Sequence, residues 1–179
     1  MLQEIGGKVS RHMTHSRSWA LRTLALALIT SSLVHARQVS GQDEVVRRRL
    51  AGEWTLVKYE VFPENGATRP GNYDVGRINY GEHEMSAHLM RSGRQKEQAT
   101  TEAARALAFQ GYLGYFGPYT IDAQTKTVTH HVVGSSLPNW AGSEQVRHYA
   151  FSNDGRQLML SLKSGDRITQ TLTWERTRP

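Results

Sequence analysis

Short segments in which apolar and polar residues alternate fill most of the chain after residue 52. A period of two residues is typical of β-strands that bury one face. The expected strands cover residues 56–62, 76–80, 84–91, 119–122, 127–133, 145–151, 157–162 and 167–175. Turn-forming stretches such as Asn153-Asp154-Gly155 and Ser164-Gly165-Asp166 separate several of them. The pattern therefore predicts strands linked mostly by hairpins, and hence antiparallel.

The period changes once, between the third and fourth predicted strands. Thr101 supplies an N-cap and Glu102 an acid in the first turn of a helix that we expect to run towards Tyr115. Four apolar residues fall on one helical face, which predicts that the helix packs on the core: Ala106, Phe109, Leu113 and Phe116. We expect Gly114 and Gly117-Pro118 to end this helix, and a shorter helix to cover residues 43–50.

Two tryptophan-containing segments bracket the strands, Gly52-Glu53-Trp54 at the start and Trp174-Glu175-Arg176 near the end. Eight antiparallel strands suit a closed up-and-down barrel, which either fills its interior with side chains or holds one small ligand. The predicted fold class is therefore mainly β: an antiparallel eight-stranded barrel with one helix inserted between the third and fourth strands.

The first 36 residues have the pattern of a secretory signal peptide. Arg11, Arg17 and Arg22 flank or enter a short apolar run that ends in Val34-His35-Ala36, so we expect cleavage after Ala36, with Met13 as an alternative start. Arg22 leaves the run short of the roughly 20 residues of a membrane span, although retention as an anchor stays open. We expect residues 37–51 to form a lead-in with a short helix, and 52–179 the barrel domain. Localisation would be periplasmic or secreted.

Composition and charge exclude several classes of function. The chain has no cysteine, which rules out disulfides, zinc–thiolate sites and cysteine nucleophiles. The leader holds four basic residues and one acidic residue, so its removal lowers the formal net charge from +6 to +3. The single tight basic run, Arg47-Arg48-Arg49, points around a helix rather than along one stripe, which predicts a solvated helix face and no nucleic-acid partner. There is no phosphate-binding glycine loop or Gly-x-Ser-x-Gly elbow, and we expect no cofactor.

Several ordered segments together resemble the lipocalin-like domain family of small bacterial and fungal proteins. They cover residues 52–57, 85–91, 111–119, 129–132, 138–140, 145–147 and 172–176. The resemblance implies a barrel that holds a small apolar molecule, without implying a reaction. It also implies that Trp54 closes the bottom of the barrel, with Arg176 packed across its ring. His88 departs from the amide side chain expected in many relatives, so a cavity-facing His88 would make ligand preference pH-dependent.

Alternation predicts which side chains could face the cavity. His130 and His131 point to opposite faces of a strand, so both cannot line one cavity, and no further ligand spacing indicates a metal site. Alternation alone does not choose between them, but the face that His130 shares with Val128 and Val132 is the more apolar. Trp140 lies on a loop that either covers the barrel mouth or packs on its wall.

Arg147 shares a polar face with Gln145 and Tyr149, and such a face is normally solvated. A buried Arg147 would need an anionic partner such as Glu144, Glu84 or a ligand carboxylate. We expect the ligand-binding residues around the mouth and upper cavity to be His88, Tyr115, His130, Asn139, Trp140, Gln145 and Arg147.

Three functions fit the sequence. The leading hypothesis is an exported lipocalin-like barrel that binds a small hydrophobic or amphipathic molecule without chemistry and does not insert stably into a membrane. The first alternative is a small-molecule isomerase or cyclase in which His130 or His131 acts as a general base, with His130 and Arg147 as the expected catalytic residues. The second is a structural or interaction barrel with a filled core, which predicts no cavity of the roughly 300 Å³ or more typical of ligand sites. The sequence does not indicate the ligand or the oligomeric state.

Overall fold

The computed structural model describes residues 41–94 and 100–177. The predicted signal peptide, its cleavage site and the alternative start at Met13 lie outside these residues. No helix within the two described ranges is both long enough and apolar enough to cross a bilayer.

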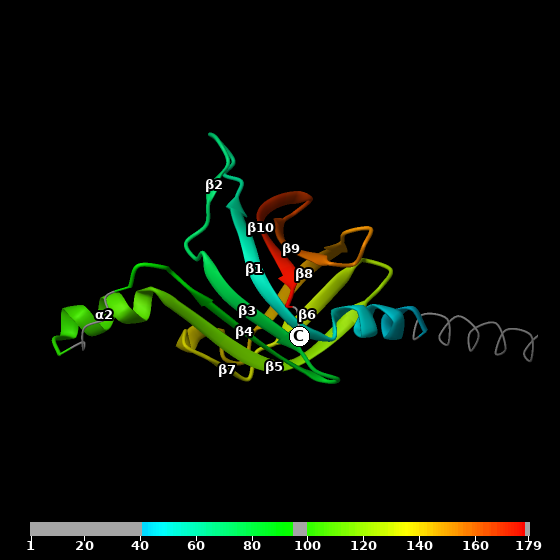
Figure 1. The fold of residues 1–179 in the computed structure, drawn as a ribbon, viewed down its shortest axis with the longest axis horizontal. Coiled ribbons are helices and arrows are strands. Elements are labelled where there is room, and N and C mark those ends of the chain that lie inside the picture. Colours follow the sequence, from blue (N-terminus) through cyan, green and yellow to red (C-terminus); the bar gives the residue numbers. More distant parts are fainter. Residues whose placement is uncertain (1–40, 95–99, 178–179) are drawn as a thin grey trace, which may run out of the picture. The chain divides into compact units, whose positions relative to one another are not determined.

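The strands of the described residues form one antiparallel sheet that closes on itself (Figure 1). Their bounds are β1 (Gly52–Val61), β2 (Arg69–Pro70), β3 (Val75–Tyr80), β4 (Glu84–Met90), β5 (Tyr112–Asp122), β6 (Thr127–His131), β7 (Gly134–Ser135), β8 (Glu144–Phe151), β9 (Gln157–Ser164) and β10 (Arg167–Arg176). Their order in the sheet is β10-β9-β8-β6-β5-β4-β3-β1-β2, and β10 also pairs with β1 to complete the ring. Because β2 and β7 are two residues long, eight longer strands make the wall. The predicted fold class is confirmed.

Alternation along the strands determines which side chains point inwards. In β3, Ile78 and Tyr80 are buried while the intervening residue is exposed. In β4, Met85, Ala87 and Leu89 are buried in the same way. This period of two allows the ladder hydrogen bonds and the apolar interior to form together, because every second residue faces the core.

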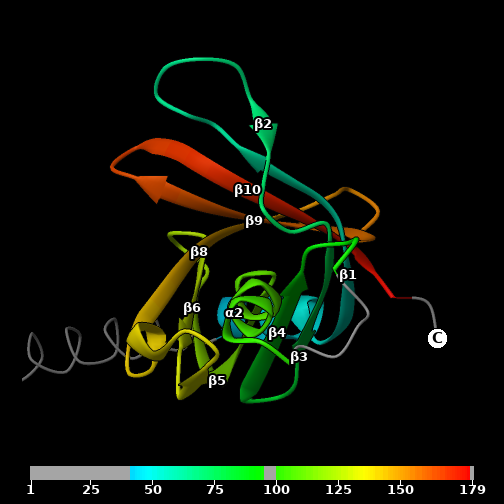
Figure 2. The same cartoon turned by 90° about the vertical axis from the view of Figure 1, so that its left-hand side faces the viewer.

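The helix α2 (Glu102–Gln110) lies between β4 and β5, the third and fourth long strands, as predicted. The Thr101 side chain accepts a hydrogen bond from Ala104 N at 3.2 Å, and Glu102 lies in the first turn, so the predicted cap is confirmed. Figure 2 views the end of the barrel at which α2 lies.

The predicted length and packing of this helix are wrong. No residue of α2 is buried, and Phe109 is 48% exposed. Leu113 and Tyr115 belong to β5, where they pair with Leu89 and Ala87 of β4 and point into the barrel. A strand at this position gains a full hydrogen-bond ladder and buries two large side chains, and these long-range gains outweigh the local helical pattern.

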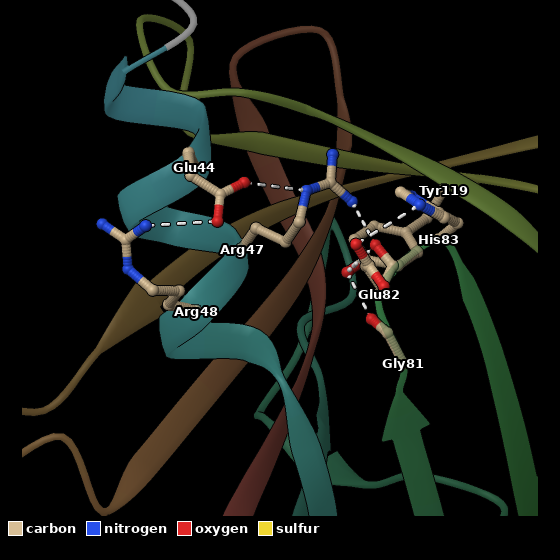
Figure 3. Close-up of polar contacts among 7 residues, drawn as sticks. All are labelled: Glu44, Arg47, Arg48, Gly81, Glu82, His83 and Tyr119. Carbon is tan, nitrogen blue, oxygen red and sulfur yellow. Dashed lines mark hydrogen bonds and ion pairs between the residues drawn. The ribbon is translucent and has the colours of Figure 1, made fainter.

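A helix over residues 41–50 lies at the opposite end of the barrel from α2 (Figure 1). Arg47 donates from Nη1 to the Glu82 carbonyl at 2.8 Å, and its guanidinium lies 5.0 Å from the centre of the Tyr119 ring (Figure 3). The Arg49 guanidinium lies 4.1 Å from the Phe151 ring centre. The prediction of a solvated face therefore holds for Arg48 and Arg49, which are exposed, and is wrong for Arg47, which is partly buried. An arginine such as Arg49 can stack on an aromatic ring and still be exposed to water.

Candidate ligand-binding site

One end of the barrel is sealed by Trp54, which is fully buried. Its Nε1 donates to the Leu50 carbonyl at 2.8 Å, and the Arg176 guanidinium lies 4.1 Å from its ring centre. The same guanidinium donates to the carbonyls of Ala51 at 2.8 Å and Arg49 at 2.7 Å. These contacts join the first strand, the last strand and the N-terminal helix, so the barrel interior is filled at this end.

The interior beyond this packed end contains a cavity of about 260 Å³. Its wall is largely apolar and aromatic, and is made by Tyr59, Tyr73, Ile78, Ala87, Leu89, Leu113, Tyr115, Leu137, Trp140, Arg147, Leu160, Leu162, Gln170, Leu172 and Trp174. The volume is close to the lower limit of about 300 Å³ seen in many small-molecule sites. At roughly 20–30 Å³ for each non-hydrogen atom, it suits a molecule of about ten such atoms.

His130 points into the barrel. It is 1% exposed, and its face-sharing neighbours Val128 and Val132 are 0% and 3% exposed, which confirms that the more apolar face is internal. His131 points the other way, where Nε2 lies 2.9 Å from Thr120 Oγ1 and Nδ1 lies 3.3 Å from Glu144 Oε1.

Two tyrosine hydroxyls occupy both ring nitrogens of His130. Tyr80 Oη lies 2.8 Å from Nε2, and Tyr115 Oη lies 3.1 Å from Nδ1. Burial holds the pKa of His130 well below its usual range, and the positive charge of Arg147 acts in the same direction. Burial also raises the pKa of Tyr115, and raises that of Tyr80 well above its usual value. At neutral pH the imidazole is therefore uncharged and both hydroxyls keep their protons.

Arg147 is the charged side chain of the cavity wall, and it is 8% exposed. It donates from Nη1 to the Val146 carbonyl at 2.9 Å and from Nη2 to Gln145 Oε1 at 3.2 Å. None of the ion pairs within residues 41–94 and 100–177 includes Arg147, and Glu144 pairs with His131 instead. The polar face of β8 therefore points inwards, and the guanidinium of Arg147 has only neutral hydrogen-bond partners.

The structure brings some of the predicted ligand-binding residues to the cavity and leaves others outside it. Tyr115, Trp140 and Arg147 line the cavity, whereas His130 and Gln145 stand behind the wall as hydrogen-bond partners of Tyr115 and Arg147.

Neither His88 nor Asn139 belongs to the cavity wall. His88 lies between the inward-facing Ala87 and Leu89, so alternation directs it outwards, and its Nδ1 lies 2.8 Å from Tyr112 Oη. Asn139 is exposed in the short 3₁₀ helix η1 (Pro138–Trp140).

Sequence reasoning missed several polar wall residues. Tyr59 donates from Oη to Gln170 Oε1 at 2.5 Å, which joins β1 to β10 at the cavity. Trp174 is 2% exposed, and its Nε1 has no hydrogen-bond partner among the described residues. Gln170 and Trp174 share a strand face with the buried Leu172, and that alternation was the signal that could have found them.

Within the described ranges, no three histidine, aspartate or glutamate side chains gather closely enough to hold a metal ion.

A family model described as a lipocalin-like domain matches residues 51–177. The 4'-hydroxy-3'-methoxypropiophenone carrier protein ppsC of Aspergillus oryzae is 31% identical over 106 residues, covering 51% of this chain and 96% of the relative. The crystal structure of a lipocalin-like protein from Bacteroides uniformis gives a TM-score of 0.44 at 14% identity, over 72% of this chain and 99% of that one. A redesigned β-barrel gives 0.38 at 12% identity, over 74% and 95%. The family match, which covers most of the chain, shows that the chain belongs to the lipocalin-like domain family.

Proposed function

We propose that this protein is an exported carrier that binds one small hydrophobic or amphipathic molecule in its barrel cavity and releases it unchanged. Export rests on the signal-peptide pattern of residues 1–36. Carriage is also the function named for the Aspergillus oryzae relative.

The cavity inside the closed barrel is the observation that supports binding. Its volume of about 260 Å³ is just below the roughly 300 Å³ typical of ligand sites, so it favours a compact ligand, and its largely apolar wall is what distinguishes it from a filled core. Its apolar wall provides affinity at roughly 25 cal/mol for each Å² of ligand surface removed from water. Because the opposite end is packed around Trp54 and Arg176, a ligand would occupy the unsealed half.

The arrangement of His130 favours binding over the isomerase or cyclase alternative. A general base must reach the proton that it removes, directly or through one water. Both ring nitrogens of His130 are within hydrogen-bond distance of tyrosine hydroxyls, and the imidazole stands behind Tyr115 rather than in the cavity wall.

A cavity-filling substitution tests the proposal. Ala87 lines the cavity and is 1% exposed, and Ala87→Leu adds three carbon atoms that would occupy roughly a third of the space at about 30 Å³ each. Ala150→Leu is the matched control, since Ala150 is exposed on β8. Indole and propiophenone are neutral probes of about the right size for this space, and isothermal titration calorimetry measures their binding.

We expect the wild type and Ala150→Leu to bind at least one probe, and Ala87→Leu to bind at least tenfold more weakly. Native mass spectrometry of protein purified from its own host should show a retained small molecule for the wild type and for Ala150→Leu. If neither probe binds, no charged probe of similar size binds, and the native protein carries no small molecule, the carrier proposal is wrong.

A further inference from the structure

The polar groups of the cavity are unequally matched, with more hydrogen-bond donors than acceptors. The guanidinium of Arg147 has five N–H groups, and two hydrogen bonds from it occur in the described structure, both to neutral oxygens. The Trp174 indole N–H, in the same wall, has no acceptor among the described residues. A ligand that supplies acceptors would fit this wall better than one that supplies donors.

Gln170 adds to this excess. Its Oε1 accepts the Tyr59 hydroxyl proton at 2.5 Å, which fixes the orientation of the amide. The Nε2 group of Gln170 therefore offers two N–H donors, while Oε1 already accepts one hydrogen bond.

The hydrogen bonds of His130 determine the orientation of the Tyr115 hydroxyl. A neutral imidazole has one N–H and one lone pair, so one tyrosine donates to the ring and the other accepts from it. Tyr80 is 1% exposed, does not line the cavity, and has only His130 as a side-chain partner in the described part of the chain. Its proton must therefore go to Nε2, since a buried hydroxyl proton without an acceptor is costly. Nδ1–H then donates to Tyr115, and the Tyr115 proton is left for the cavity.

We propose that the ligand of this cavity is an anion: a compact aromatic or aliphatic molecule with a carboxylate, or with an acidic phenol or enol bound in its deprotonated form, held by Arg147 and the hydroxyl of Tyr115. The inference rests on the proposed carrier function and specifies the class of molecule carried. No aspartate or glutamate belongs to the described wall, so the guanidinium charge is uncompensated. A buried charge of this kind is best satisfied by a ligand of opposite charge in hydrogen-bond contact.

Two probes of nearly equal size and shape test the sign of the ligand charge. trans-Cinnamate carries a carboxylate, whereas cinnamamide presents a neutral amide on the same framework. By isothermal titration calorimetry at neutral pH, we expect the wild type to bind cinnamate about 10- to 100-fold more tightly than cinnamamide. In Arg147→Gln this preference should disappear while cinnamamide affinity changes little. Arg69→Gln is the control, because Arg69 is an exposed arginine of β2 outside the cavity wall, and it should keep the preference.

A spectroscopic measurement on the wild type does not depend on the folding of any variant. 4-Nitrophenol changes colour when it loses its proton, so at a pH slightly below its pKa the protein should increase the phenolate absorption band. Arg147→Lys, which keeps the charge without the planar fork, should preserve part of this increase.

The outcomes separate the two proposals. Equal binding of cinnamate and cinnamamide, or tighter binding of the amide, would overturn the anion inference and leave the carrier function standing. An unchanged phenolate band on binding of 4-nitrophenol would also count against the anion. Failure of all neutral and charged probes to bind would remove the carrier function and the anion inference together.

Discussion

Lowering the pH should destabilise this protein through His130 before its carboxylates titrate. The imidazole is 1% exposed and faces Tyr80 from β3, Tyr115 from β5 and the positive charge of Arg147 from β8. These surroundings hold its pKa well below the usual 6.5. In the unfolded chain the same histidine binds a proton near pH 6.5. Falling pH therefore favours the unfolded state, and stability is lost from about pH 6.5 down to the folded pKa.

The magnitude follows from proton linkage. If His130 stays neutral in the folded protein, the free energy of unfolding falls by about 2 kcal/mol between pH 7.5 and pH 5.0, with a limiting slope of about 1.4 kcal/mol for each pH unit. For a domain of this size that loss lowers the melting temperature by roughly 5–8 °C. The pKa values of Asp74, Asp122 and Asp154 are lowered, so their stabilisation is lost only below about pH 4.

Urea unfolding at half-unit steps from pH 7.5 to 5.0 measures the effect. The pKa of the partly exposed His148 is also lowered, so the comparison with His130→Gln isolates the contribution of His130. That variant should lose most of the slope, whereas replacement of the partly exposed His148 by glutamine should leave most of it in place. NMR of the imidazole nitrogens provides the direct check, and a His130 ring that titrates near pH 6.5 in the folded protein would refute the reasoning.

Two further substitutions test the sealed end and the cavity charge. Arg176→Gln should lower the free energy of unfolding by about 1–3 kcal/mol, because it removes the stacking on Trp54 and two hydrogen bonds to carbonyls. Arg156→Gln, at an exposed position, is the control. If the two variants lose the same stability, the stacking on Trp54 contributes little. Arg147→Met should raise the stability of the ligand-free protein by about 1 kcal/mol, or roughly 3 °C in melting temperature, because it removes a buried charge without an anionic partner. A loss of stability in thermal unfolding would show that the guanidinium is already well accommodated.

The strands were predictable because each one carries its own signal. Inward-facing residues such as Ile78 and Tyr80, or Leu158 and Leu160, recur at every second position and are buried in the structure. The segment from 111 to 117 was not predictable in this way, because Leu113 and Phe116 fit a helical period while Leu113 and Tyr115 fit an extended one. Pairing with β4 decides between them, and such a long-range contact leaves no mark in the local pattern.

The site was harder to predict than the fold, because β8 reverses the usual rule that the internal face of a barrel strand is the less polar one. Val146 is 46% exposed on the outer face, while Arg147 is buried on the inner one. Polarity alone would therefore assign this strand the wrong way round, whereas pairing with β6 and β9 fixes its orientation. Local rules are most often broken where function requires it. No carboxylate of the described chain pairs with the Arg147 guanidinium. Its burial is physically reasonable if a ligand neutralises its charge. Arg147, the wall residue least compatible with an apolar core, is therefore the one that we expect to select the ligand.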